Sequence, residues 1–173
     1  MLVEARVATL VDVRRFPGSR RHPQFGREEL AAAVREAGLR YTWQGESLGG
    51  RRQARPGSRH TALRNASFVA YADHMDTAPF RTAIDDLIAG AASELPAVLC
   101  AETLWWHCHR MLIADALVLR GAAVEHLLAD GRVQPHAEIE ETLLKKAGGE
   151  DLFEDRAARL ARAYQAREKA MKR

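Results

Sequence analysis

The chain of 173 residues has only two cysteines, six prolines and 6% aromatic residues. Two cysteines in a domain of this size are too few for a disulfide framework, which favours a reducing compartment, so we expect a cytoplasmic protein. There is no run of about 18 apolar residues, and we therefore expect no membrane-spanning helix. The first 15 residues are too acidic, and their apolar stretch is too short, to predict a signal peptide.

Arginine, in contrast, is abundant in one part of the chain. The net charge of +3 does not by itself indicate nucleic-acid binding. Ten of the arginines between residues 14 and 64 nevertheless lie mostly in predicted loops: Arg14, Arg15, Arg20, Arg21, Arg27, Arg51, Arg52, Arg55, Arg59 and Arg64. Arginine in loops suits recognition of phosphate or carboxylate, because its planar guanidinium donates two parallel hydrogen bonds. The alternative is that arginine only keeps this protein in solution, and the Ala/Arg-rich C-terminal segment supports that interpretation.

Short apolar runs alternate with helical patterns along the chain. The pattern predicts strands at 8–14, 39–43, 96–102 and 122–128, helices at 27–39, 67–75, 77–92 and 107–121, and a turn at 130–132. A polar loop with four glycines and five arginines fills 44–65. Loops longer than about 12–15 residues inside a compact domain are usually functional or disordered.

This alternation predicts an α/β fold, a Rossmann-like three-layer sandwich with a mostly parallel sheet flanked by helices. We expect one α/β domain over residues 1–136. Residues 137–173 are strongly charged and helical in pattern, and we expect them to pack on that domain or to trail from it.

In such folds, ligands bind outside the carboxyl ends of the strands. Asp12 and Arg14 end the first predicted strand, and Cys100 and Glu102 end a later one. The stretch CAETLWWHCHR, residues 100–110, continues from that second strand end into the predicted helix that starts at 107. Two distant segments are therefore expected to bring polar side chains to one edge of the sheet.

The first interpretation of this stretch is a metal site. Cys100, Cys108 and His109, with Glu102 and His107 nearby, are soft and borderline ligands suited to zinc or iron. Structural zinc sites, however, favour ligand pairs spaced by two to four residues. Cys108 and His109 are neighbours, and neighbouring helical residues point about 100° apart. We therefore predict no metal site here.

The second interpretation is thiol chemistry. Cys100 sits at a strand end and Cys108 near a helix N-terminus, where the helix dipole lowers the pKa of a thiol. Glu102 is a candidate general acid or base, so Cys100, Glu102 and Cys108 are the candidate catalytic residues. Alternatively, both cysteines are small core residues, which is a common use of cysteine.

The third interpretation is anion binding. His109 and Arg110 open a helix whose free backbone N–H groups favour phosphate, and Arg14 lies at the neighbouring strand end. The glycine-rich loop can fold over this place, and we expect its Gly50 and Arg51 to contribute to binding.

Other residues have supporting or open roles in this interpretation. Asp12 is expected to orient Arg14 or Arg110, whereas Tyr71 and Asp73 line the pocket or tie down the loop. Trp105 and Trp106 stack on a base or cap the pocket, although core packing is expected for at least one of them. His60 is expected to be solvated.

The segments VDVRRFPGSRRHPQF, GESLGGRRQARPGSRHTALRNASFVAYADHM and CAETLWWHCHRMLIADAL together resemble one family of bacteria and archaea. It is the domain of unknown function 488 family, and the resemblance covers about residues 5–136. The resemblance implies an α/β fold and a polar pocket built from these motifs. It implies no particular reaction or cofactor.

One departure from the family pattern concerns the N-terminus. Family members usually begin with a strand that carries a Thr-Ile-Gly-His-Ser-like motif, whereas this chain starts near the end of the helix that follows. Either the start is misassigned or the chain is a shortened version. A missing strand would expose a sheet edge, which we expect a second copy to cover in a homodimer. It would also remove a histidine and a serine from the pocket.

These observations lead to three functional hypotheses. The first is a pocket for a phosphate-bearing ligand, either a nucleotide or nucleic acid, in which Arg14 and Arg110 hold the anion and Glu102 orients it. The second is a thiol- or metal-dependent enzyme that acts on a small molecule through Cys100, Cys108 and His109. The third is a non-catalytic interaction module that uses its basic C-terminal helices.

Overall fold

The computed structural model describes residues 1–136 except residues 20, 61–62 and 64. The predicted C-terminal extension, 137–173, therefore lies outside the described residues. Three parallel strands form the central sheet in the order β2-β1-β3, with bounds β1 Thr9–Asp12, β2 Arg40–Trp43 and β3 Pro96–Leu99. Asp12 is level with Trp43 on one side and with Leu99 on the other, so all three carboxyl ends lie at one edge.

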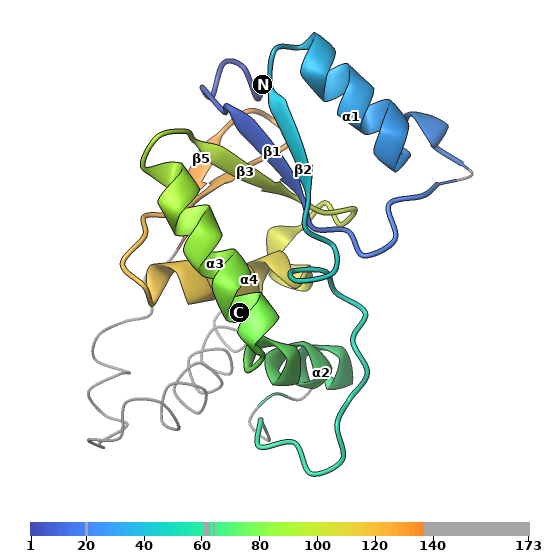
Figure 1. Ribbon diagram of the computed structural model, residues 1–173, viewed down its shortest axis with the longest axis vertical. Helices are drawn as coiled ribbons and strands as arrows, with labels where there is room; N and C mark the ends of the chain where they lie inside the picture. The colour runs from blue at the N-terminus through green and yellow to red at the C-terminus, as the bar shows by residue number, and fades with distance from the viewer. Residues whose placement is uncertain (20, 61–62, 64, 137–173) are drawn as a thin grey trace.

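Helices cover both faces of this sheet. Alternate residues of β1 point to opposite sides and therefore pack against different helices. Leu10 packs with Val34 and Leu39 beneath helix α1 (Arg27–Glu36). Val11 and Val13 point the other way, into the larger core formed with α2 (Ala66–Met75), α3 (Ala78–Ala91) and α4 (Arg110–Val118). The predicted α/β fold, with a parallel sheet between helices, is confirmed (Figure 1).

Local sequence signals mark two of the helix ends. Thr77 caps α3, since its side-chain oxygen accepts a hydrogen bond from the backbone N–H of Phe80. Gly38 follows α1 with a φ of +80°, a left-handed conformation that glycine adopts without steric cost.

In the second half of the chain, one predicted helix starts later than expected, and one predicted strand is confirmed but lies outside the parallel sheet. The helix expected from residue 107 begins at Arg110, and a short 3₁₀ turn, η2, occupies Trp105–His107. The strand expected at 122–128 is β4, Glu125–Leu127, which pairs antiparallel with β5, Val133–Pro135, and does not join the parallel sheet. The tight turn at Gly131, with φ of +82°, allows this local hairpin.

The hairpin packs against the stretch that follows β3. The ring of Trp105 stacks on that of His126, with centroids 3.8 Å apart and planes 4° from parallel. His126 in turn contacts His136 across 2.8 Å, and His136 contacts the buried Asp115 of α4 across 2.7 Å. Trp105 is only 7% exposed, so the expectation of core packing for one tryptophan is confirmed.

Within the described part of the chain, no helix is long and apolar enough to cross a membrane. Strands β2 and β3 form the two edges of the described sheet. The homodimer expected to cover a sheet edge remains a prediction.

Candidate functional site

The carboxyl ends of β1 and β3 meet as the strand pattern predicted. The backbone N–H of Val13 donates to the carbonyl of Leu99 across 2.9 Å, so the residues that follow both strands start from the same place. Arg14 and Cys100 consequently line one pocket, although 86 residues separate them in the sequence.

At the β1 end, Asp12 holds Arg14 in a fixed position. The carboxylate is completely buried and accepts hydrogen bonds from Arg14 Nε at 2.8 Å, from Arg14 Nη2 at 2.6 Å and from the Tyr41 hydroxyl at 2.7 Å. Arg14 Nη1 donates to the carbonyl of Phe25 at 2.7 Å. Asp12 thus orients Arg14, as predicted, and all three guanidinium nitrogens of Arg14 already have protein partners.

The contacts of Asp12 also shift the pKa values of Arg14 and Tyr41. The hydrogen bond with Asp12 raises the pKa of Arg14, so the guanidinium stays charged. Burial, followed by the hydrogen bond to Asp12, raises the pKa of Tyr41 to about 12. The Tyr41 phenol therefore remains a neutral donor to Asp12 at ordinary pH.

Arg110 does not reach the pocket that the sequence assigned to it. Its Nη2 donates to the carbonyls of Glu102 and Thr103, and Arg110 is not among the described residues that line the pocket. Its guanidinium braces the loop after β3. The first N–H groups of α4 are also in use, because Arg110 N–H donates to Cys108 Sγ and Met111 N–H to the Cys108 carbonyl.

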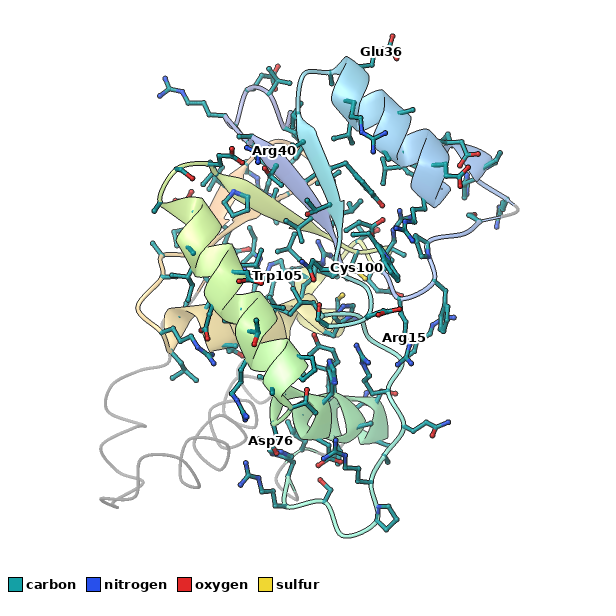
Figure 2. All side chains as sticks on the ribbon, in the orientation of Figure 1. Arg15, Glu36, Arg40, Asp76, Cys100 and Trp105 are labelled. Atoms are coloured by element: carbon teal, nitrogen blue, oxygen red, sulfur yellow. The ribbon has the colours of Figure 1, made fainter. Side chains whose placement is uncertain are left out.

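The pocket at this edge has a volume of about 500 Å³. Two guanidinium groups on its wall, Arg15 and Arg51, form no ion pair with a carboxylate of the described residues. Arg15 Nη1 makes a long contact of 3.5 Å to the Arg51 carbonyl, and its guanidinium carbon lies 5.7 Å from the centre of the Phe16 ring. The lining residues come from the loops that follow β1, β2 and β3, and the polar ones are Arg14, Arg15, Ser19, His22, Arg51, Cys100, Glu102 and His109. Figure 2 shows Arg15 and Cys100 at this edge.

Gly50 and Arg51 do contribute to the pocket, as the loop composition predicted. Gly50 lies against the imidazole of His109, and a Cβ at residue 50 would be 2.9 Å from His109 Nδ1. Arg51 has a φ of +54°, an uncommon conformation for a residue with a side chain. The loop therefore reaches the pocket through a close glycine contact followed by a strained backbone position.

Tyr71 lies behind this wall. It is 1% exposed, and its hydroxyl donates to the carbonyl of Leu48 at 2.6 Å, with its ring 5.0 Å from that of His109. Of the two roles predicted for Tyr71, holding the loop is therefore the one observed. Burial raises its pKa well above the ordinary value, so the hydroxyl stays a donor.

Cys100, Cys108 and His109 lie together at the base of the pocket. One ligand atom from each lies within 4.8 Å of those of the other two, and Cys108 Sγ is 3.6 Å from His109 Nδ1. The sequence argument against this grouping assumed that Cys108 and His109 share a helix. Cys108 is instead extended, with φ −117° and ψ 152°, so the assumption is wrong.

The two thiols share one hydrogen bond and ionise differently. The hydrogen bond from the Cys108 thiol lowers the pKa of Cys100 to about 4, with further help from His109 and the Glu102 backbone. The pKa of Cys108 is raised by the same hydrogen bond. Cys100 is therefore the more acidic thiol of the pair, whereas the sequence placed the stronger dipole effect at Cys108. Glu102, the candidate acid or base, is exposed at the pocket rim.

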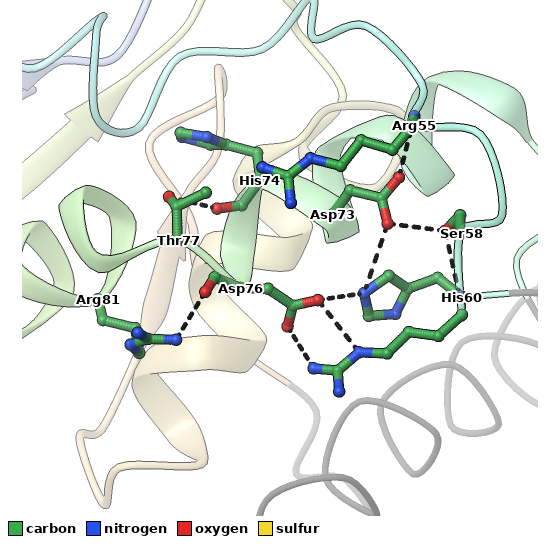
Figure 3. A network of polar contacts seen from close by, with 9 residues as sticks. Arg55, Ser58, His60, Asp73, His74, Asp76, Thr77 and Arg81 are labelled. Carbon is green, nitrogen blue, oxygen red and sulfur yellow. Dashed lines mark hydrogen bonds and ion pairs between the residues drawn. The ribbon is translucent and has the colours of Figure 1, made fainter.

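A separate polar cluster anchors the far half of the 44–65 loop (Figure 3). His60 Nε2 lies 2.9 Å from Asp76 Oδ2, and Arg59 pairs with the same carboxylate at 2.7 Å. Burial would raise the pKa of Asp76, but the hydrogen bonds with His60 and Arg59 lower it. Ser58 binds Asp73 at 2.7 Å. The prediction that His60 is solvated is wrong, because it is 5% exposed.

Sequence reasoning missed both this cluster and the role of Arg15. The adjacent Arg14 matched the strand-end pattern equally well, and no spacing distinguishes an arginine held by Asp12 from one left for a ligand. For His60, the signal was weak: two carboxylates three residues apart at the end of a helix, opposite a loop histidine.

With this geometry in view, comparisons with known proteins identify the family. The model of the family described as "Domain of unknown function DUF488" matches residues 1–117. The chain belongs to this family. The match ends before the hairpin, whereas the resemblance noted in the sequence extended to about residue 136. No curated protein and no solved structure shows significant similarity to the chain.

Proposed function

We propose that the strand-end pocket binds a small phosphate-bearing molecule, and that Arg15 and Arg51 are its anion ligands. The observation that carries this proposal is the pair of guanidinium groups without carboxylate partners on one pocket wall. Unpaired arginines gathered in a concave site favour an anionic ligand, because the planar fork matches phosphate oxygens. Arg14 lies on the same wall, but Asp12 neutralises its charge, and Asp12 and the Phe25 carbonyl already use its donors.

The same pocket offers aromatic surface. Phe16 and Phe25 are 67% and 50% exposed and line it beside the arginines. Exposed aromatic rings next to cationic groups suit a ligand that carries both a planar ring and a phosphate, because bases stack on such rings. The volume of about 500 Å³ is in the range of small-molecule sites. A mononucleotide fits these features better than a long nucleic-acid strand does.

A second hollow in the described residues is a weaker candidate. It lies between the loop after β2 and the start of α3, and its arginine, Arg52, donates to the carbonyls of Gly49 and Glu46. Its histidine, His74, contacts the Ser47 carbonyl at 2.6 Å. The polar groups there already bind the protein backbone, so we expect them to stabilise the loop and not to bind a ligand.

The proposal is tested by calorimetric titration with AMP and with inorganic pyrophosphate. In the double variant Arg15→Ala/Arg51→Ala we expect the affinity to fall by about 30-fold, since each exposed charge-assisted hydrogen bond contributes about 1 kcal/mol. The control variant Arg35→Ala/Arg132→Ala removes the same charge from exposed places outside the pocket. It should bind like the wild type.

Equal losses in both double variants would show non-specific attraction to a basic surface and would contradict the proposal. So would an unchanged affinity without Arg15 and Arg51. Binding of a single-stranded oligonucleotide that AMP does not displace would assign the contact to nucleic acid and to another surface.

A further inference from the structure

The cluster at the base of the pocket contains two thiols and an imidazole, the ligands that zinc prefers. With metal–ligand distances of about 2.3 Å to sulfur and 2.0–2.1 Å to nitrogen, two ligands of a tetrahedral zinc ion lie about 3.6 Å apart. Cys108 Sγ and His109 Nδ1 are 3.6 Å apart. The third ligand atom, from Cys100, lies within 4.8 Å of both. The separations therefore suit one shared ion.

The Cys108 sulfur atom also receives a backbone N–H from the residue two positions further on. Arg110 N–H donates to Cys108 Sγ at 3.5 Å. Such N–H groups stabilise negative charge on sulfur and tune thiolates that bind metals.

Apart from the contact between its Nδ1 and Cys108 Sγ, the imidazole of His109 is held in place by packing. His109 is confined between Gly50 and the ring of Tyr71, and its Nε2 is buried without a hydrogen-bond partner among the described residues. Since Nδ1 is the nitrogen that faces Cys108, this is the nitrogen available for an ion.

The cluster is closed on one side and open on the other. Cys108 is 2% exposed, whereas Cys100 and His109 line the pocket. Three protein ligands with one open position are typical of catalytic zinc sites, whereas structural sites have four protein ligands. An ion held here would therefore face whatever occupies the pocket.

We propose that Cys100, Cys108 and His109 bind one zinc-class divalent cation and leave its fourth coordination position open to the pocket. This assignment goes beyond phosphate binding and does not depend on it, because it rests on different residues. The ion would add positive charge at the base of the pocket, close to Arg15 and Arg51, and could polarise a bound oxygen atom.

Another group of potential ligands in the described residues, His60, Asp73 and Asp76, does not support such a site. Arg59 already neutralises Asp76 with two hydrogen bonds, and Ser58 and the backbone of Arg55 bind Asp73. An ion would have to displace these contacts.

Cobalt titration of chelator-treated, reduced full-length protein tests the site directly. We expect thiolate-to-cobalt charge-transfer absorption and intense visible bands of four-coordinate cobalt that saturate at one ion per chain and disappear when zinc is added. Cys100→Ser, Cys108→Ser and His109→Asn should each weaken zinc binding by more than about 100-fold, because each removes a ligand. His107→Asn is the control, since this exposed histidine lies two residues from His109 and outside the cluster.

No cobalt band, or a band that survives loss of either cysteine, would overturn the assignment. A disulfide between the two thiols in protein kept with zinc and without reductant would also overturn it. Circular dichroism of each variant identifies any loss caused by unfolding, and Cys108→Ala provides a second variant that keeps a small side chain in the core. The Arg15→Ala/Arg51→Ala variant should keep the cobalt spectrum, so failure of the metal site and failure of phosphate binding remain distinguishable.

Discussion

Asp12→Ala should destabilise the protein by about 3–5 kcal/mol, because the substitution leaves the Arg14 guanidinium without its buried counter-charge. The Asp12 side chain is completely buried and that of Arg14 is only 10% exposed. Breaking such a pair by removing one partner is costly, since the remaining charge keeps its desolvation penalty without compensation. A loss of this size is a large share of the stability of a typical domain.

Urea unfolding measures this effect, and Asp85→Ala is the matched control. Asp85 is 64% exposed and pairs with Arg120 at 3.0 Å, so its loss should cost less than about 1 kcal/mol. Should Asp12→Ala not fold, Asp12→Asn retains the shape and an acceptor while removing the charge. Equal costs for Asp12→Ala and Asp85→Ala would contradict the view that Asp12 organises the strand end.

Asp12→Asn has a spectroscopic consequence at Tyr41. Burial is the first cause that raises the pKa of Tyr41 to about 12, and the hydrogen bond with Asp12 is the second. Without the carboxylate charge, the pKa of Tyr41 should fall but stay above its ordinary value, because burial remains. Ultraviolet absorbance of the phenolate against pH follows this change.

Gly50→Ala should weaken zinc binding by about 10- to 100-fold while leaving the fold intact. The new methyl group would lie 2.9 Å from His109 Nδ1, so the imidazole must move away from its place beside Cys108. The backbone of residue 50 is not in the left-handed region, and the substitution therefore strains only the side-chain contact. Displacing a ligand without deleting it typically costs affinity on this scale.

Gly90→Ala is the control for this substitution. Gly90 lies within α3, and a Cβ there meets nothing within 4 Å. Alanine in a helix interior is favoured over glycine by about 0.5–1 kcal/mol, so this variant should be slightly more stable and should bind zinc normally. If Gly50→Ala bound zinc as tightly as Gly90→Ala, the close contact between Gly50 and His109 would have no role in the metal site.

Sequence patterns predicted the parts of this protein that depend on local order. The apolar runs ending at Asp12 and Cys100 are level neighbours in a parallel sheet, and the rule on strand ends then brings Arg14 and Cys100 to one pocket. The sequence predicted that Asp12 orients Arg14 or Arg110, and Arg14 is the partner observed. These inferences needed only strand periodicity and charge.

The start of α4 could not be predicted in the same way, because distant contacts determine it. Residues 105–107 form a 3₁₀ turn in which Trp105 packs on His126, a residue of the later hairpin. This turn leaves Cys108 extended and moves the first helical residue to Arg110. The metal interpretation was rejected on a helix geometry that Cys108 does not have.

Which arginines are available to bind an anion also depends on tertiary structure. Arg110 reaches carbonyls of the loop after β3, whereas Arg15 and Arg51 lie on the pocket wall without carboxylate partners among the described residues. All three are equally suited to phosphate by residue type. Only the paths of the two loops decide which guanidinium groups remain available.

A crystal structure of the protein grown with zinc and pyrophosphate tests the central claim most directly. The account predicts an anomalous zinc peak bonded to Cys100, Cys108 and His109, with pyrophosphate density in the same pocket in contact with Arg15 and Arg51. Zinc bound elsewhere, together with pyrophosphate on another surface or an empty pocket, would contradict it.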